Sequence, residues 1–370
     1  MKKGSEEKPR PSRTTDKYWV PIVAKTLDLI DCFCSDSDTL TLEEIVRVTS
    51  IPHTTAYRIL HTLVARGHLL QSGRRYRLNR GRKRLKIGFA NLSKKIVLAT
   101  EIQASLEQAA QESQIDLRTW DNNRDADTAV RNAEEMAQAG VQVAIEFQLF
   151  EQVAPIITDI LARAKIPVIS VVNPHHGTLY FGVNNYRAGF TAGLALADYA
   201  ARRWREAPDA LLLLGSTQGV RTVQSRLIGV QRGVEERLGS LSARIVHQID
   251  YGGDRTSAEG VVKNFMARVP ATRVLIAGIN DESALGAVRA AEALRDPAKF
   301  AIVGHGGSRE ILNLLAEPAT PCIGTVSFRA ELYGPGLVAF ALAVATGRSV
   351  GPAQYVPFEF IGRAKMPTQK

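Results

Sequence analysis

The sequence contains few cysteines and none of the long apolar runs that mark secreted or membrane-spanning proteins. Its 370 residues include three cysteines, at positions 32, 34 and 322, and their spacing matches no metal-binding or redox motif. We expect buried or free thiols in a reducing compartment. No apolar run approaches the length of a transmembrane helix, and residues 1–17 lack the apolar core of a secretory signal. We therefore expect a cytoplasmic protein without a membrane partner.

Several motifs that would indicate an enzyme are also absent. No Gly-x-Gly-x-x-Gly sequence follows a candidate strand, and neither a phosphate-binding Gly-Lys-Ser/Thr loop nor a nucleophile elbow occurs. We predict that the protein uses no cofactor or metal and is not an enzyme. The alternative is an α/β enzyme that processes a sugar phosphate, because doubly wound folds host many enzymes.

Positive charge is concentrated in the first quarter of the chain. The formal net charge is +10, and residues 1–86 hold 18 lysines and arginines against 9 aspartates and glutamates. The remaining 284 residues hold 29 against 28. We interpret residues 1–17 as a disordered basic tail. The seven basic residues between 74 and 84 lie in or just after a patterned segment, which is the electrostatic footprint of a part that meets phosphate.

Residues 20–66 have the pattern of three helices. Apolar residues recur at helical spacing in the first. Thr39 or Thr41 can cap the second, which has two glutamates in its first turn. Pro52 suits the first turn of the third helix, and Gly67 ends it. The third helix has one apolar face and one polar face.

The polar face of the third helix is a candidate DNA-reading surface. In a helix-turn-helix the beginning of the second helix of the motif enters the major groove, where donors and arginines contact bases and phosphates. The outward-facing residues are His53, Thr54, Thr55, Tyr57, Arg58 and His61.

Residues 68–79 alternate like a β-hairpin. Leu69, Tyr76 and Leu78 share one strand parity, and Ser72-Gly73 can form the turn. Three arginines of this wing would contact the phosphate backbone or the minor groove. They are Arg74, Arg75 and Arg77.

The run TLTLEEIVRVTSIPHTTAYRILHTLVARGHLLQSGRRYRLN, residues 39–79, resembles the winged helix-turn-helix of IclR-type transcription regulators. The match is most specific in PHTTAYRILHTL. The resemblance implies a double-stranded DNA operator as partner, read by a homodimer that places two heads on two half-sites. We assign residues 18–80 to this DNA-binding domain and residues 81–84 to a short basic linker.

From residue 85 onward the chain alternates between strand-like and helix-like segments. Runs such as ALLLL and RVLIAG are typical of parallel strands buried on both faces. The pattern predicts a doubly wound α/β fold that is too long for one sheet and forms two. The candidate strands span 85–91, 115–120, 141–147, 167–172, 179–183, 210–214, 244–249, 273–278, 300–304, 321–326 and 355–361.

Several blocks of this region resemble the type I periplasmic sugar-binding fold, which LacI-type repressors use as a sensor. These blocks include KIPVISVVN, FGVNNYRAGFTAGLALADY and IAGINDESALGAVRAAEAL. The resemblance implies a ligand-sensing domain over residues 85–370 with two lobes. One lobe would hold about 85–185 plus 329–356, and the other 186–328 plus 357–370. The ligand would bind between them, at the carboxyl ends of the strands.

The combination departs from both families. IclR-type heads normally precede another effector domain, and LacI-type sensors normally follow another headpiece with a hinge helix. Here only RGRKR, residues 80–84, joins the wing to the first sensor strand, so a hinge helix does not fit.

The resemblance implies ligand-binding residues at the strand ends. Arg226 matches the arginine that clamps ligand oxygens, and Asn280 matches the asparagine that bonds sugar hydroxyls. Asp281 is interpreted as a helix cap, and Phe328, at a lobe crossing, can cover a ligand face. Further candidates are Asn91, Phe147, Gln148, Asn173 and His305.

The departures from the sugar-binding pattern indicate the kind of effector. Asp-Arg after the IPVI block is replaced by Val172-Asn173, and the Asp of VGFDG by Gly306. Carboxylates that accept from neutral sugars are thus depleted, whereas Arg226 suits a carboxylate or phosphate. We favour a sugar acid or sugar phosphate over a neutral sugar. The alternative to a regulator, apart from an enzyme, is the solute-binding module of a transport system.

Overall fold

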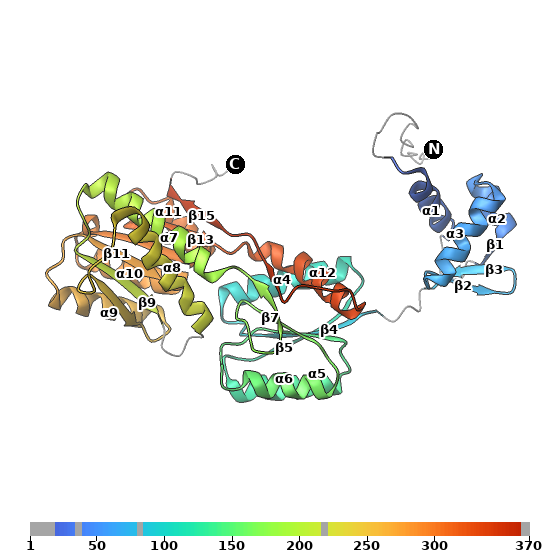
Figure 1. The fold of residues 1–370 in the computed structure, drawn as a ribbon, viewed down its shortest axis with the longest axis horizontal. Coiled ribbons are helices and arrows are strands. Elements are labelled where there is room, and N and C mark those ends of the chain that lie inside the picture. The colour runs from blue at the N-terminus through green and yellow to red at the C-terminus, as the bar shows by residue number, and fades with distance from the viewer. Residues whose placement is uncertain (1–18, 34–38, 80–83, 216–220, 364–370) are drawn as a thin grey trace, which may run out of the picture. The chain divides into compact units, whose positions relative to one another are not determined.

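The computed structural model describes residues 19–33, 39–79, 84–215 and 221–363. The chain forms two compact units, a head over Met1–Lys83 and a C-terminal unit over Arg84–Lys370 (Figure 1). The predicted tail, Cys34 and most of RGRKR lie outside the described residues. No helix within the described ranges is long and apolar enough to span a membrane.

The head contains the predicted three helices and hairpin. A short strand that the sequence pattern did not predict completes a three-stranded antiparallel sheet in the order β1-β3-β2. The elements are α1 (Pro21–Asp31), β1 (Leu40–Thr41), α2 (Leu42–Thr49), α3 (His53–Ala65), β2 (Leu69–Ser72) and β3 (Arg75–Leu78).

Local sequence explains where the head elements begin and end. Thr41 is the N-cap of α2 and forms a capping box with Glu44, which satisfies two free backbone donors. Pro52 is the N-cap residue of α3. Ser72 pairs with Arg75 in the hairpin, so Gly73 and Arg74 form the turn. The predicted turn over Ser72-Gly73 is therefore shifted by one residue, because Gly73, at φ 60°, takes the positive-φ position that such a turn requires.

The first sheet of the C-terminal unit is parallel, in the order β14-β8-β7-β6-β4-β5, and we call this sheet with its helices lobe 1. α4 (Val97–Glu112) and α12 (Tyr333–Ala345) cover one face, and α5 (Ala126–Gln138) and α6 (Ala154–Arg163) the other (Figure 1). The strands are β4 (Lys86–Asn91), β5 (Asp116–Asp121), β6 (Val143–Glu146), β7 (Val168–Val171), β8 (Leu179–Gly182) and β14 (Ala353–Tyr355).

The second sheet has the order β10-β9-β11-β12-β13-β15 and, with its helices, forms lobe 2. All pairs are parallel except β13 with β15. The strands are β9 (Ala210–Gly215), β10 (Val246–Asp250), β11 (Val274–Gly278), β12 (Phe300–Gly306), β13 (Cys322–Ser327) and β15 (Glu359–Gly362). The helices are α7 (Asn185–Tyr199), continued by the π-helix η1 (Ala200–Trp204), α8 (Arg221–Leu238), α9 (Arg255–Arg268), α10 (Asp281–Ala293), η2 (Pro297–Lys299) and α11 (Arg309–Leu315).

The predicted α/β fold with two sheets is confirmed, but one predicted strand is wrong. Residues 355–361 do not form one strand: β14 ends in lobe 1 and β15 begins in lobe 2. Pro357 lies between them, and proline cannot donate to a strand ladder. The chain also changes sheets after β8 and after β13, where η3 (Ala330–Leu332) leads into α12.

Helices α7 and α8 cross in backbone contact at four glycines. A Cβ on Gly189 would overlap the carbonyl oxygen of Arg226, and one on Gly193 would overlap that of Val230. Gly229 and Gly233 of α8 meet the backbone of α7 in the same way. This contact sets the position of the segment of α8 that carries Arg226.

Candidate functional site

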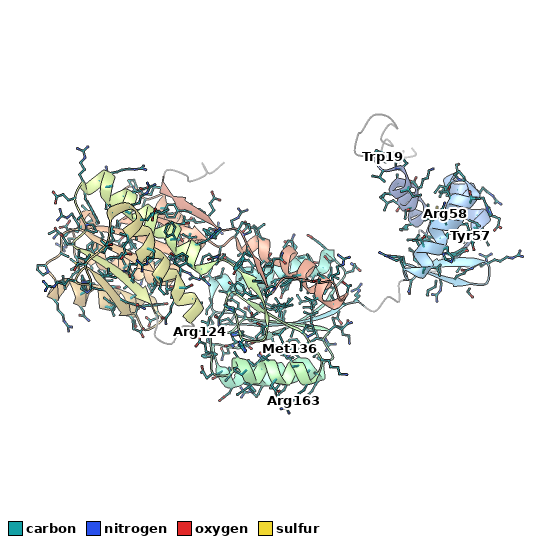
Figure 2. All side chains as sticks on the ribbon, viewed as in Figure 1. Trp19, Tyr57, Arg58, Arg124, Met136 and Arg163 are labelled. Carbon is teal, nitrogen blue, oxygen red and sulfur yellow. The ribbon has the colours of Figure 1, made fainter. Side chains whose placement is uncertain are left out.

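The polar face of α3 is exposed, as the sequence predicted. His53, Thr54, Tyr57, Arg58 and His61 are exposed, and Thr55 is half-buried. Tyr57 and Arg58 lie on the head (Figure 2), and the rings of Tyr57 and His61 are 6.2 Å apart. The opposite face of α3 supplies buried Ile59 and Leu60 to the core of the head.

The three arginines of the wing differ in their surroundings. Arg74 at the turn and Arg77 on β3 are exposed. Arg75 is also exposed, but its Nη1 donates to the Thr39 carbonyl at 2.8 Å and lies 3.9 Å from the Glu44 carboxylate. Arg74 and Arg77 therefore have the freer guanidinium groups for phosphate.

In lobe 2, Arg226 is a buried cation held by neutral oxygens. Its side chain is 3% exposed. Nε and Nη2 donate to Asn185 Oδ1 at 3.2 and 2.6 Å, and Nη1 donates to the Ile279 carbonyl. None of the ion pairs among the described residues includes Arg226. Burial lowers the pKa of Arg226 to about 10, which leaves it charged at neutral pH.

Phe328 and His305 lie beside Arg226. The Arg226 Cζ is 4.6 Å from the centroid of the Phe328 ring, a cation–π contact, and the rings of His305 and Phe328 are 6.5 Å apart. His305 Nδ1 is 2.7 Å from the Gly278 carbonyl, so it carries the proton. Burial first, and then the charge of Arg226, lower the pKa of His305 to about 3. Both Phe328 and His305 are buried.

The interpretation of Asp281 as a helix cap is wrong. Asn280 is the N-cap of α10 and accepts from Ser283 N, while its Nδ2 donates to the Tyr251 hydroxyl at 3.0 Å. Asp281 instead forms buried hydrogen bonds to two other segments of lobe 2. Its carboxylate accepts from Ser308 N at 2.6 Å and from the Thr325 hydroxyl at 2.7 Å. A Cβ at Gly306 would approach Asp281 Oδ2 to 2.9 Å, so this space is already filled.

In lobe 1, four predicted ligand residues lie at the carboxyl ends of adjacent strands β4, β6 and β7. Asn91, Gln148 and Asn173 are fully buried, and Phe147 nearly so. Asn173 Nδ2 donates to the Gln148 carbonyl at 3.0 Å, and Gln148 Nε2 lies 3.2 Å from His175 Nε2. Burial lowers the pKa of His175 to about 4, so that it is neutral.

Three of the predicted residues have buried polar atoms without a hydrogen-bond partner in the described part of the chain. The atoms are Asn91 Oδ1, Asn173 Oδ1 and His305 Nε2. Such orphans are rare in proteins and indicate a water, an ion or a ligand. The structure thus brings Arg226, His305 and Phe328 together in lobe 2, and Gln148 and Asn173 together in lobe 1. Asn280 stands apart, because its side chain is committed to the cap and to Tyr251.

Sequence reasoning missed several residues of these clusters. Asn185 holds Arg226, and Glu146 is a buried acid at the end of β6 with Oε2 unpartnered among the described residues. The sequence signal for Asn185 is the pair of asparagines at the start of α7, because Asn184 is the N-cap and leaves the Asn185 side chain for another role. No group of three or more His, Cys, Asp or Glu able to hold a metal occurs in the described ranges.

Two families match the chain. Residues 87–349 match the periplasmic binding protein domain, and residues 22–73 match the IclR helix-turn-helix domain. No curated protein matches the chain. The first match covers well over half of the residues, and together the two cover most of the described chain.

Solved structures share the fold of the C-terminal unit. One is an ABC transporter periplasmic solute binding protein from Actinobacillus succinogenes with bound D-allose, at 18% identity and TM-score 0.67, covering 76% of this chain and 98% of that one. Another, from Mycobacterium smegmatis in complex with β-D-fucofuranose, has 23% identity and TM-score 0.66, covering 76% and 92%.

A glucose-galactose binding protein from Geobacillus stearothermophilus has 20% identity and TM-score 0.67, covering 77% of this chain and all of its own. At these identities the likeness shows the fold alone. By its matched residues, the chain belongs to the family of periplasmic binding protein domains and carries an IclR helix-turn-helix domain ahead of it.

Proposed function

We propose that the protein is a ligand-responsive transcription regulator. The observation that carries this proposal is the presence in one chain of an IclR helix-turn-helix domain and a periplasmic binding protein domain. The head would bind a double-stranded DNA operator, and the binding domain would take a small carbohydrate-like effector. Such a protein acts in the cytoplasm as a homodimer on two half-sites.

The exposed side chains of the head support DNA binding by α3 and the wing. Arg58 and Tyr57 project from the helix that would enter the major groove, and arginines can read guanine there. Arg77 lies on the wing, where a cation adds affinity without sequence information.

This assignment is tested with DNA fragments selected from random sequence. Arg58→Ala should lower affinity for the selected site by about 10-fold or more and reduce its ratio to random DNA. Arg77→Ala should weaken both alike and reduce the salt slope by about one. Arg163→Ala, the same charge change at an exposed arginine at the end of α6, is the control. An unchanged ratio in Arg58→Ala would show that α3 does not read bases.

For the effector, we propose an anionic carbohydrate, such as a sugar acid or sugar phosphate. Arg226 is the observation behind this proposal. A buried cation is costly unless it is paired. The hydrogen-bond partners of Arg226 in the described chain are neutral oxygens, and the buried Asp281 carboxylate acts on it without an ion pair. A ligand carboxylate or phosphate would supply the missing charge through charge-assisted hydrogen bonds.

Titration calorimetry with hexuronates, aldonates and sugar phosphates, against the matching neutral sugars, tests the effector class. We expect the acids to bind more tightly. Arg226→Gln should then weaken acid binding by about 10- to 100-fold, the size of a hydrogen bond to a charged group. Arg232→Gln, an exposed arginine of the same helix, should leave it unchanged. Equal binding of neutral sugars and acids would refute an anionic effector.

The second candidate is a solute-binding role in transport, because solved structures with this fold include transporter solute-binding proteins. The two functions differ in one measurement. A regulator binds its selected DNA with an affinity that the effector changes, whereas a transport component has no sequence-specific DNA affinity. An enzyme would instead convert the bound carbohydrate, and product analysis after incubation detects this.

A further inference from the structure

The amide of Asn91 at the end of β4 has a defined direction. Its Nδ2 donates to the Ala99 carbonyl at 3.1 Å and to Gln103 Oε1 at 2.8 Å. Both protons of the amide are thereby used. Its Oδ1 is buried and has no partner among the described residues. Asn91 therefore offers only an acceptor.

Glu107 fixes this direction through Gln103, one turn away on α4. Gln103 Nε2 donates to Glu107 Oε1 at 2.7 Å. Because an ionised carboxylate can only accept, the NH₂ of Gln103 faces Glu107 and its oxygen faces Asn91. A flip of the Asn91 amide would place its oxygen against two other oxygens, those of Ala99 and Gln103.

Asn173, at the end of β7, has the same polarity. Its Nδ2 donates to the Gln148 carbonyl, an obligate acceptor, and its Oδ1 is buried and without a partner in the described ranges. The preceding Val172 has φ 64°, and Asn173 N lies 2.6 Å from the Val171 carbonyl. A β-branched residue in this tight, positive-φ turn is strained, and such strain is concentrated at functional sites.

Lobe 1 thus offers two oriented acceptors at the carboxyl edge of its sheet, where ligands of open α/β sheets bind. We propose that Gln103 and Glu107 are positioning residues that hold Asn91 as an acceptor, so that this edge selects ligand hydroxyl donors. This inference rests on the proposed function. With Arg226 in lobe 2, it narrows the effector to a hydroxylated anion, since a simple carboxylate or phosphate leaves both acceptors unpaired.

The ligand side is tested with six-carbon probes that differ in one property at a time. The aldonates and hexuronates carry charge and hydroxyls, the corresponding alditols and hexoses carry hydroxyls alone, and hexanoate carries charge alone. We expect the protein to bind at least one hydroxylated acid, and to bind hexanoate at least about 10-fold more weakly. Hexanoate binding as tight as the best hydroxylated acid would overturn the selection of hydroxyls.

The protein side is tested on the tightest-binding probe of that panel. Gln103→Leu should weaken binding of this probe by about 5-fold or more, the effect of one lost hydrogen bond or somewhat more. It should also reduce the protein's preference for the probe over the matching compound that lacks the hydroxyls. The double exchange Gln103→Glu with Glu107→Gln keeps the net charge and an acceptor facing Asn91, and should restore binding. Gln108→Leu is the control, because Gln108 and Glu112 form the same type of pair on the same helix at 3.0 Å.

The outcomes separate this inference from the proposed function. If Gln103→Leu lowers stability but its probe affinity and probe preference equal those of Gln108→Leu, then Gln103 and Glu107 have only a structural role and the inference is wrong. If neutral alditols or hexoses bind as tightly as the acids, the proposal of an anionic effector is wrong. The Gln103 variants then still test whether Gln103 and Glu107 position Asn91. If no probe binds, both the carbohydrate effector and this inference fail.

Discussion

At the scale of single residues, burial sets the protonation state of Glu146, the last residue of β6. It is 1% exposed, and Oε1 accepts from Asn122 Nδ2 at 3.0 Å. Asn132 in turn donates to Asn122 Oδ1 at 2.8 Å. Burial raises the pKa of Glu146 from its ordinary value of 4.5 to about 8, against the opposing effect of Asn122. The group is therefore mostly protonated in the folded protein at neutral pH.

This pKa makes stability depend on pH. Above pH 4.5 the unfolded chain releases a proton that the folded chain keeps until about pH 8. The contribution of Glu146 to stability is complete below pH 4.5 and falls by about 1.4 kcal/mol per pH unit as the pH rises toward 8. Glu146→Gln removes this loss, so its free energy of unfolding should rise relative to wild type between pH 5 and 8.

Urea denaturation from pH 4.5 to 8.5 measures the difference. Glu134→Gln, an exposed acid on α5, is the control and should run parallel to wild type. If Glu146→Gln also runs parallel to wild type over this range, then Glu146 is ionised in the folded protein.

At the scale of elements, the crossing of α7 and α8 is the contact on which the lobe 2 site depends. The glycines allow the two backbones to touch, and the first of these contacts is with the backbone of Arg226 itself. Asn185, the first residue of α7, then reaches the Arg226 guanidinium. The glycines at the crossing therefore determine both how closely the helices approach and where the Arg226 guanidinium lies.

Adding one methyl group to this crossing should separate the helices. Gly193→Ala places a Cβ against the Val230 carbonyl, which is backbone and cannot yield without a shift of the helix. Overpacking of this kind costs about 1–3 kcal/mol, and we expect a lower free energy of unfolding together with weaker binding of acidic ligands. Gly260→Ala in α9, where a Cβ meets nothing within 4 Å, should be neutral or stabilise by up to about 1 kcal/mol. Denaturant titration compares the two, and equal stability would mean that the crossing tolerates side chains.

For the whole molecule, we propose a homodimer and place part of its interface on α1. Trp19, Val20, Val23 and Leu27 are all more than half exposed, and the last three share a helix face. Residues 1–18 are polar or charged except for Met1, Gly4, Pro9, Pro11 and Tyr18, and contain no apolar run. A second copy of α1 would cover this face, and a dimer is what two operator half-sites require.

Leu27→Glu should therefore shift the protein from dimer to monomer in sedimentation experiments and weaken binding to a two-half-site operator. Val48→Glu is the matched control, because Val48 on α2 is 69% exposed and lies outside this face. A dimer that persists in Leu27→Glu places the interface elsewhere, and a monomeric wild type refutes the homodimer.

The sequence predicted much of this molecule because its signals are local. The helix periods, the cap at Thr39 or Thr41, the wing parity and the buried strand runs each depend on neighbouring residues. The misreadings came where distant residues decide. Asp281 looks like a cap beside its helix but accepts from Ser308 and Thr325, and residues 355–361 look like one strand but their two ends pair with different sheets.

The sequence by itself determined the two-part organisation and the exposed face of α3, and its resemblance to a known family singled out Arg226 as a candidate. Only the tertiary structure decided which of that cation's neighbours are neutral and which amide oxygens are left without partners. The physical reason is that hydrogen-bond direction is set by groups far apart along the chain. Glu107 orients Gln103 and Asn91, Gln148 orients Asn173, and α7 brings Asn185 to Arg226.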